Sequence, residues 1–421
     1  MSIVKNSKYN CIKNEIITAI IAFFTCSYII IVNSTLLEVA GMPLKWSIVA
    51  TTIVCAISCI LVGAYAKVPF IIIPGVGETI FFTFTVVKSH NYTYQEALVV
   101  VLFSGIIFLF ISFTPLVSKM NFSIPDSLKT GITIGIGLFM AFVGLQNSGI
   151  LVGNKQTMVS LNEWNLTLVI ALLVLLISLI LFTAKIKLAF LYTIIIGSII
   201  SFLTGVAEYK EKISFLNMNS VINENTFLGF DFQKIGEFSF WSLVFSLTIL
   251  ILFQNIGTVN GLMDLDKEKI KKTFKAIGLS NIISSLLGVS STVVAVESAT
   301  ATHLGAKKGR VTVIVGVMFV LSLLFIPLIT SIPSLAISPI LIIIGGLMFI
   351  NIKTIDFEDM SEYIPCYITI IMIPLTYDIA TGMGFGFISY VIINLFKWNI
   401  RKLNPTIIVI ALLFILSYLF A

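Results

Sequence analysis

Two carboxylates stand inside apolar segments of the chain, where ionisable groups are rare. Glu78 follows a Pro-Gly-Val-Gly sequence, and Glu297 follows a run rich in Ser, Thr and Val. A carboxylate near the centre of a bilayer costs about 2.5 to 3.5 kcal/mol on insertion scales, so it is a candidate for function. We predict that both acids contact a ligand and exchange a proton, Glu297 above all. The alternative for each is a structural acid that holds neighbouring backbone.

Neutral polar residues accompany these acids. Thr79 and Ser298 each follow directly after an acid, while Gln254 and Asn255 lie side by side in the middle of another apolar run. Amides present both donors and acceptors, and they can contact the edge of a planar heterocycle without using charge. We predict that all four residues contact the ligand. Hydrogen bonding between helices is the alternative for the two amides.

The composition places these residues in a lipid bilayer. Of 421 residues, 58% are hydrophobic and 11% are charged. A spanning helix needs about 20 largely apolar residues, so about 14 or 15 spans would use most of the chain and leave no separate soluble domain. The net charge of +6 is typical of basic cytoplasmic loops and does not indicate nucleic-acid binding.

Several kinds of chemistry are disfavoured by what the sequence lacks. The five cysteines have no paired Cys-x-x-Cys spacing, and the two histidines, His90 and His303, are not clustered with other metal ligands. We find no Ser/His/Asp set, Walker loop or cofactor motif. Repeated glycines lie inside apolar segments, where their spacing indicates close helix packing and not a nucleotide loop. The sequence therefore predicts neither an enzyme nor a bound metal or cofactor.

The apolar segments indicate a duplicated architecture. Seven of them precede a polar stretch at 206–239, seven follow it, and a last apolar run covers 406–420. The sequence that ends at Pro125 also resembles the one that ends at Pro333. Two seven-span units in series must be inverted relative to each other, because seven is odd. We expect an all-α polytopic membrane protein with 14 spans in a 7+7 inverted repeat.

Two segments differ from ordinary spans. Residues 68–82 contain a β-branched run cut by proline and glycines, and residues 286–301 contain a Ser/Thr/Val run before Glu297. Each is predicted to form a short extended piece followed by a half-helix, in the third and tenth spans. Extended backbone at bilayer depth must be buried in protein or line a cavity, and interrupted spans at matching positions of two repeats indicate a substrate site.

Basic residues predict the orientation. If the N-terminus is cytoplasmic, the loops with Lys185, with the lysines of 267–272, with Lys307 and with Arg401 all lie inside, and the 206–239 loop lies outside. One inside loop, at 353–362, departs from this pattern because its acidic residues outnumber its lysine. Acidic residues weigh little in the rule.

A set of short motifs recurs in order along the chain: Val32-Asn33, Gly41-Met42-Pro43, Ala50-Thr51, Pro74-Gly75-Val76-Gly77, Ser123-Ile124-Pro125-Asp126-Ser127-Leu128-Lys129, Gly135-Ile136-Gly137-Leu138-Phe139, Glu297-Ser298-Ala299 and Pro374-Leu375-Thr376-Tyr377. In these motifs the sequence resembles a known family, the AzgA-like purine permeases of the nucleobase:cation symporter and nucleobase-ascorbate transporter group. The resemblance covers about residues 14 to 400.

The resemblance implies proton-coupled uptake of adenine, guanine or hypoxanthine across the plasma membrane, often by a homodimer. It also implies a core domain of spans 1–4 and 8–11 and a gate domain of spans 5–7 and 12–14. Glu297 matches the acid of the tenth span that binds the purine and takes part in proton coupling. The expected division is a first repeat at 14–205, an extracellular loop at 206–239, a second repeat at 240–397 and a tail with an extra helix at 398–421.

The chain departs from the family pattern in two spans. The eighth span of the family carries two aspartates, which are replaced here by Ile251 and Gln254, while its Gly-Leu-Asn-Ala in the third span reads Gly77-Glu78-Thr79-Ile80. Our hypothesis is that Glu78 partly compensates for the missing acid, with Gln254 and Asn255 as neutral contacts to the base. The alternatives are a divergent member that carries another small solute or an anion, and a uniporter without proton coupling.

Overall fold

The fold is described by a computed structural model over residues 2–114, 124–154, 156–186, 188–207, 229–263, 265–399 and 402–420. Most of the predicted extracellular loop, residues 208–228, lies outside the described residues.

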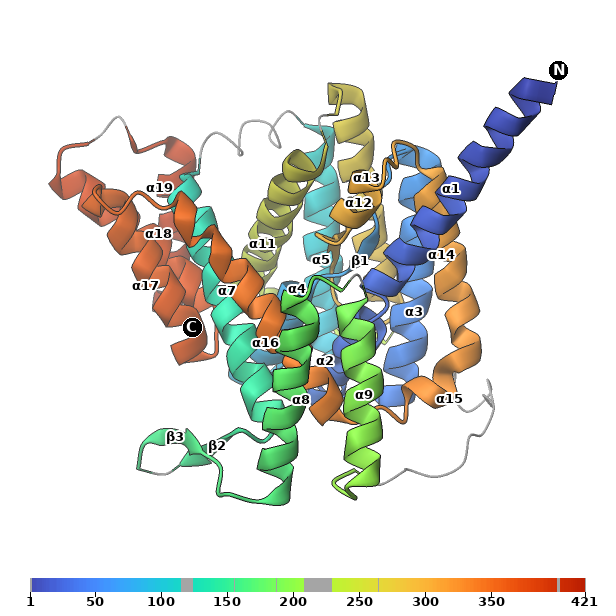
Figure 1. Ribbon diagram of the computed structural model, residues 1–421. Coiled ribbons are helices and arrows are strands. Elements are labelled where there is room, and N and C mark those ends of the chain that lie inside the picture. Colours follow the sequence, from blue (N-terminus) through green and yellow to red (C-terminus); the bar gives the residue numbers. More distant parts are fainter. Residues whose placement is uncertain are drawn as a thin grey trace.

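The described residues are mostly helical, as Figure 1 shows. The described elements before residue 208 are α1 Ser2–Cys26, α2 Ile29–Val39, α3 Leu44–Leu61, η1 Val62–Ala66, β1 Ile72–Pro74, α4 Val76–Ile80, η2 Phe81–Ser89, α5 Tyr94–Phe113, α7 Asp126–Asn147, β2 Leu151–Asn154, β3 Met158–Leu161, α8 Leu166–Thr183 and α9 Ala189–Leu203. Those after residue 228 are η3 Gln233–Gly236, α11 Phe238–Leu262, α12 Lys267–Leu286, β4 Thr292–Val294, α13 Ser298–His303, α14 Arg310–Ser322, η4 Leu323–Phe325, α15 Ile326–Ile329, α16 Ser334–Phe349, η5 Ile350–Thr354, α17 Met360–Thr376, α18 Ile379–Phe396 and α19 Pro405–Phe420.

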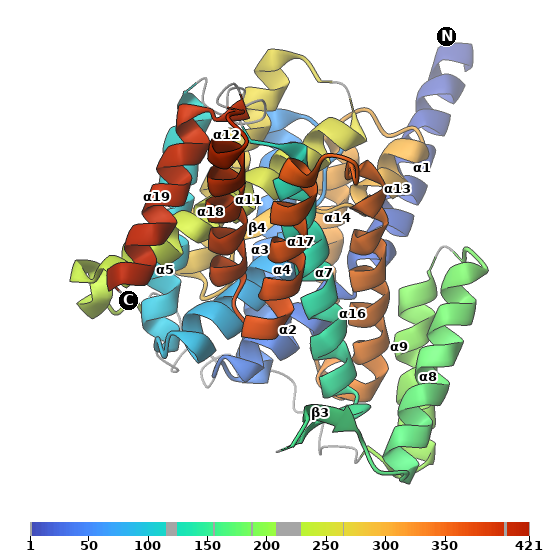
Figure 2. The same ribbon diagram turned by 90° about the vertical axis from the view of Figure 1, so that its left-hand side faces the viewer.

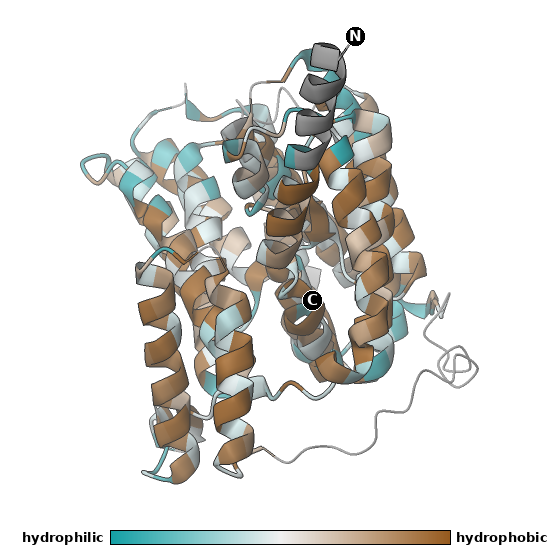
Figure 3. Cartoon of the chain, turned by 45° about the vertical axis from the view of Figure 1, so that its right-hand side comes forward, coloured by the Kyte–Doolittle hydropathy of each residue, from teal (hydrophilic) through white to brown (hydrophobic). Residues whose placement is uncertain are grey.

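The expectation of a helical multi-pass membrane protein is confirmed. Within the described residues, nine helices are long and apolar enough to cross a membrane. Figure 3 shows the apolar residues along the middle of the helices and the polar ones gathered at both ends of the molecule.

The count of 14 spans is not confirmed. Two apolar helices, α9 and α17, are short for a full crossing at 15 and 17 residues. α12 begins with a lysine-rich turn, which lowers its hydropathy. The segments that hold β1 and β4 are broken by extended backbone. By length and composition, these segments are therefore not among the nine candidate spans.

The helices form two groups. The first, here called the strand-bearing group, holds β1 and β4 with helices α1 to α5 and α11 to α14. In it α3 packs on α14, and α5 packs on both α11 and α12. The second helical group consists of α7 to α9 and α16 to α18, with α16 packed on α7 and the α8–α9 hairpin lying against α16 (Figure 2).

Close glycine contacts bring the α7–α16 pair together. A Cβ atom added to Gly345 would lie 2.2 Å from the carbonyl oxygen of Gly137, and one added to Gly137 would lie 2.7 Å from that of Gly345. No side chain fits at such distances, so these backbones touch directly. The predicted packing role of Gly137 is confirmed.

Several packing contacts have a counterpart when the two halves of the chain are exchanged. If the segments of the two halves are matched in order, α3 on α14 corresponds to α12 on α5, and the α8–α9 hairpin corresponds to the α17–α18 hairpin. The antiparallel strands β1 and β4 correspond to each other in the same way.

The last helix, α19, lies on both groups. The hydroxyl of Tyr418 donates to the carbonyl oxygen of Thr381 at the start of α18 (2.9 Å). The hydroxyl of Ser242, near the start of α11, donates to that of Ser417 (2.6 Å). The chain just before α19 is held by Lys402, which contacts Asp359 at the start of α17.

Candidate functional site

The two interrupted segments meet and pair with each other. β1 and β4 form an antiparallel pair in which Ile72 faces Val294 and Pro74 faces Thr292. Two further backbone hydrogen bonds extend it, from the Gly75 N–H to the Ser291 carbonyl (3.1 Å) and from the Ala295 N–H to the Ile71 carbonyl (2.9 Å). The predicted extended pieces are confirmed, and their pairing satisfies backbone groups that lipid would leave unsatisfied.

Glu297 lies where this strand pair gives way to α13. Its carboxylate Oε1 accepts a hydrogen bond of 2.5 Å from the Tyr28 hydroxyl. The Glu297 side chain is partly exposed, and its neighbour Val296 is 65% exposed. The Glu297 side chain is therefore not completely enclosed by the protein.

Glu297 does not act as a helix cap. It occupies the N-cap position of α13, but its side chain makes no capping hydrogen bond to the backbone of that helix. The alternative, in which Glu297 is a structural acid that holds the first turn of α13, is therefore not supported.

Glu78 is fully buried in α4, where Gln254 of α11 faces it. With the amide nitrogen turned toward the acid, Gln254 donates to both carboxylate oxygens, at 2.7 and 3.1 Å. Gly75 lies directly against the Glu78 carboxylate, because a Cβ atom at position 75 would lie 1.8 Å from Glu78 Oε2. The two residues at which the sequence is expected to depart from the family motif, Glu78 and Gln254, are thus direct neighbours.

Thr79 belongs to a buried hydrogen-bond network. Its hydroxyl lies 2.6 Å from Asn33 Oδ1, 2.6 Å from the Ser290 hydroxyl and 2.8 Å from the Gly75 carbonyl. The Asn33 amide nitrogen donates in turn to the Thr51 hydroxyl (2.7 Å). The network joins α2, α3 and α4 to the chain before β4.

Asn255 and Ser298 hold the strand pair itself. Asn255 Oδ1 accepts from the Val294 N–H (2.9 Å), and its amide nitrogen donates to the Ile251 carbonyl (2.8 Å). Ser298 accepts from the Ile71 N–H (3.0 Å). Both side chains are buried, so in this conformation they serve the scaffold.

All six predicted residues thus gather around one strand pair. Glu297 and Gln254 are partly exposed, whereas Glu78, Thr79, Asn255 and Ser298 are buried. Direct contact with a ligand stays a prediction for each of them.

Sequence reasoning did not assign three polar partners of this site, Tyr28, Asn33 and Ser290. Asn33 belongs to the Val32-Asn33 motif and Ser290 to the Ser/Thr/Val run before Glu297, and these two signals could have identified them. Tyr28 directly precedes an apolar run that begins at Ile29. Within the described part of the chain, no group of three or more His, Cys, Asp or Glu residues is arranged to hold a metal ion.

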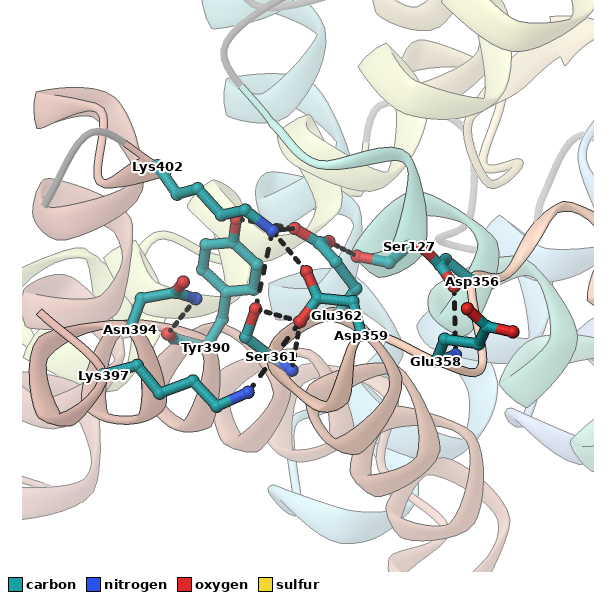
Figure 4. Close-up of polar contacts among 10 residues, drawn as sticks. All are labelled: Ser127, Asp356, Glu358, Asp359, Ser361, Glu362, Tyr390, Asn394, Lys397 and Lys402. Atoms are coloured by element: carbon teal, nitrogen blue, oxygen red, sulfur yellow. Dashed lines mark hydrogen bonds and ion pairs between the residues drawn. The ribbon is translucent and has the colours of Figure 1, made fainter. Parts of the chain in front are cut away.

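A second polar cluster lies outside this site, at the start of α17 (Figure 4). Glu362 accepts from Lys402 (3.1 Å), Tyr390 (3.1 Å) and Ser127. Asp359 accepts from Lys402 at 2.6 Å. Two of the acidic residues that departed from the charge pattern, Asp359 and Glu362, therefore have a basic partner in Lys402, from beyond α18.

Hydrogen bonds hold the pKa of the Asp359 carboxyl well below its usual value. The largest cause is the bond from Lys402, followed by those from the hydroxyl and N–H of Ser361. Asp359 lies in the loop before α17, outside the apolar spans.

The sequence matches the model of a permease family, Xan_ur_permease, over residues 13–385. Three relatives are similar over nearly the whole chain. The nucleobase transporter PlAzg2 of Paenibacillus larvae is 34% identical over 90% of this chain and 76% of its own length. The guanine/hypoxanthine permease PbuO of Bacillus subtilis is 32% identical, covering 96% and 97%. The adenine permease AdeP of Escherichia coli is 30% identical, covering 97% and 93%.

Among solved structures, the fold is similar to the transmembrane domain of a cyanobacterium bicarbonate transporter, BicA. The TM-score is 0.65 at 14% sequence identity, covering 88% of this chain and 97% of that one. At this identity the similarity shows a shared fold and nothing about the solute.

Proposed function

Because the chain belongs to this permease family and is a transporter and not an enzyme, we propose that it imports purine nucleobases: adenine, guanine or hypoxanthine. The import is coupled to protons and proceeds by alternating access across the plasma membrane. The three relatives named above support the substrate class, because each carries nucleobase or purine transport in its name.

The observation that carries the proposal is the position of Glu297. Glu297 lies beside the strand pair that interrupts two spans, and its side chain is partly exposed. One of its carboxylate oxygens, Oε1, accepts a hydrogen bond from the Tyr28 hydroxyl. A carboxylate oxygen accepts hydrogen bonds from N–H groups, which purine bases present along their edges. Intramembrane acids are also typical of solute and proton pathways.

The surroundings of both acids support a proton as the coupling ion. The partners of Glu297 and Glu78 are a tyrosine and an amide, and neither acid has a cationic partner among the described residues. A buried charge without a counter-charge is costly, and a proton removes that cost.

The fold supports the proposed movement. We assign the strand-bearing group to the core and the second helical group to the gate, with repeats at 14–205 and 240–397. The packing contacts related by exchange of the two halves support this inverted repeat. The basic residues at the starts of α12 and α14 support a cytoplasmic N-terminus.

The test is uptake of labelled adenine, guanine, hypoxanthine and uracil into a bacterial strain that lacks purine transport. We expect saturable purine uptake that a protonophore abolishes and that Glu297→Gln lowers at least about tenfold, since a charge-assisted contact is lost. Saturable uptake that ignores the protonophore would retain the substrate class and reject the coupling. A well-expressed protein that imports no base would reject the substrate class.

Transport of an anion is the second candidate, favoured by the fold similarity to a bicarbonate transporter. Carboxyl groups beside both half-helices argue against it, because an anion site in such a fold is expected to present positive charge or bare half-helix N-termini. Bicarbonate and sulfate uptake in the same cells distinguishes the two candidates.

A further inference from the structure

Tyr28 is the one side chain among the described residues that hydrogen-bonds the Glu297 carboxylate. The two residues are 269 positions apart, and the hydroxyl reaches Oε1 at 2.5 Å. Tyr28 lies at the turn between α1 and α2 and is only 4% exposed. A bond this short from a buried donor to an acid orients both groups.

The Tyr28 ring is itself held in place. It packs edge-on against Phe190 of α9, with ring centroids 5.3 Å apart. Phe190 stacks on Phe182 of α8 at 6.0 Å. Because these helices belong to the second helical group, the aromatic column fixes the direction of the hydroxyl from the opposite side of the site.

The direction of the Glu297 side chain follows from this contact. An N-cap side chain ordinarily turns back to accept from its own helix, but Glu297 makes no such bond in α13. It is turned to Tyr28 instead, while Oε2 has no side-chain donor among the described residues. One oxygen is anchored, and the other remains available.

We infer that Tyr28 is a positioning residue for the transported solute. Its hydroxyl anchors Oε1 of Glu297, so that Oε2 is presented to an N–H group of the purine. Its contact with Phe190 makes this arrangement depend on how the strand-bearing group sits against the second helical group. The inference rests on the proposed function for the identity of the solute, but the Tyr28–Glu297 contact can be tested without it.

The experiment compares two tyrosine-to-phenylalanine changes, Tyr28→Phe and Tyr390→Phe. Both remove a hydroxyl that donates to a glutamate and keep the ring, but Tyr390 contacts Glu362 in the second polar cluster, outside this site (Figure 4). We expect Tyr28→Phe to raise the KM for purine uptake about tenfold with little change in maximal rate, because an anchored acceptor becomes free to rotate. Tyr390→Phe leaves KM unchanged.

A second readout needs no substrate. Dicyclohexylcarbodiimide labelling of Glu297 in native membranes is followed by mass spectrometry, with Glu297→Gln as the blank. Tyr28→Phe is expected to increase the labelling several-fold, because the carboxyl is no longer engaged, whereas Tyr390→Phe does not change it. Equal behaviour of the two variants in KM and in labelling overturns the inference. If the wild-type protein imports no purine, the proposed function fails, and the labelling still decides whether Tyr28 engages Glu297.

Discussion

At the scale of single residues, the two expected departures from the family motif lie next to each other in the structure. The resemblance to the family motif implies that Gln254 stands where an acid is expected and Glu78 where none is expected. With the amide nitrogen of Gln254 turned toward the acid, these two side chains are in hydrogen-bond contact. The strand pair therefore keeps one acid in this position, carried by α4 and not by α11. This contact supports the hypothesis that Glu78 compensates for the lost aspartate.

The compensation predicts an exchange experiment. Glu78→Gln should lower purine uptake about tenfold, because the pair loses its only proton-accepting carboxylate. The double change Glu78→Gln with Gln254→Glu moves the acid to α11 and should restore most of the uptake. The measurement is initial uptake rate against external pH. If Glu78→Gln transports like the wild type with the same pH dependence, the hypothesis is wrong.

At the scale of elements, the strand pair depends on side chains from neighbouring helices. Three backbone N–H groups along β1 and β4 are satisfied by side chains: Ile71 by Ser298, Val294 by Asn255, and Thr292 by Asn281. A two-stranded ribbon is marginal by itself. Its rigidity comes from the helices that surround it.

This dependence predicts a loss of stability for Asn255→Ala. The buried Val294 N–H would lose its acceptor, which costs about 1 to 3 kcal/mol in the free energy of unfolding. Asn394→Ala is a matched control, because Asn394 is also buried and donates to the carbonyl four residues earlier, but its Oδ1 has no partner in the described structure. Denaturant unfolding of the two variants in detergent should separate them, and equal losses would contradict the role of Asn255.

At the scale of the whole molecule, two polar regions have different tasks. The region around β1 and β4 lies in the strand-bearing group, and Tyr28 beside it contacts Phe190 of the second helical group. The cluster of Asp359 and Glu362 joins α7, α17, α18 and the chain before α19 within one group (Figure 4). The contacts of Lys402 with this cluster thereby hold the chain before α19 against the proposed gate.

The cluster predicts a pH-dependent stability. The pKa of Asp359 is lower in the folded protein than its usual value of about 4, so its contribution is present above pH 4 and is lost as the pH falls through the folded pKa. The unfolding temperature in detergent should fall below about pH 4, and Asp359→Asn should reduce that fall. Asp356→Asn is the control in the same loop, where the carboxylate accepts from the Glu358 N–H and has no basic partner in the described part of the chain. An unchanged pH profile in Asp359→Asn would rule out this contribution.

The contacts of α19 predict the side on which the chain ends. Before its first turn, Lys402 lies beside Asp359 at the start of α17, and near its end Tyr418 lies beside Thr381 at the start of the antiparallel α18. α19 therefore runs from one end of the molecule to the other. In a Cys11→Ser background, a cysteine added after Ala421 should react with an impermeant maleimide on intact cells, while Glu358→Cys should react only after permeabilisation. Labelling of both positions from the same side would show that α19 does not cross.

The sequence by itself determined the features that arise from local chemistry. Long apolar runs demand helices in lipid, and proline, glycine and β-branched residues break such helices wherever they cluster. Residues 68–82 and 286–301 were identified in this way, as were Glu78 and Glu297, because an acid in an apolar run is conspicuous without any structure. The motifs of the family added the expected architecture and solute class.

The tertiary structure alone decided the partners. Tyr28 with Glu297, Gln254 with Glu78 and Lys402 with Asp359 are contacts between segments far apart in the sequence. Their formation depends on how helices pack, which is set by the shapes of many side chains together and is not encoded in local spacing. Asn255 illustrates the difference. Its position in an apolar run identified it as a candidate site residue, but only the packing of α11 against β4 places its amide oxygen at the backbone N–H of Val294.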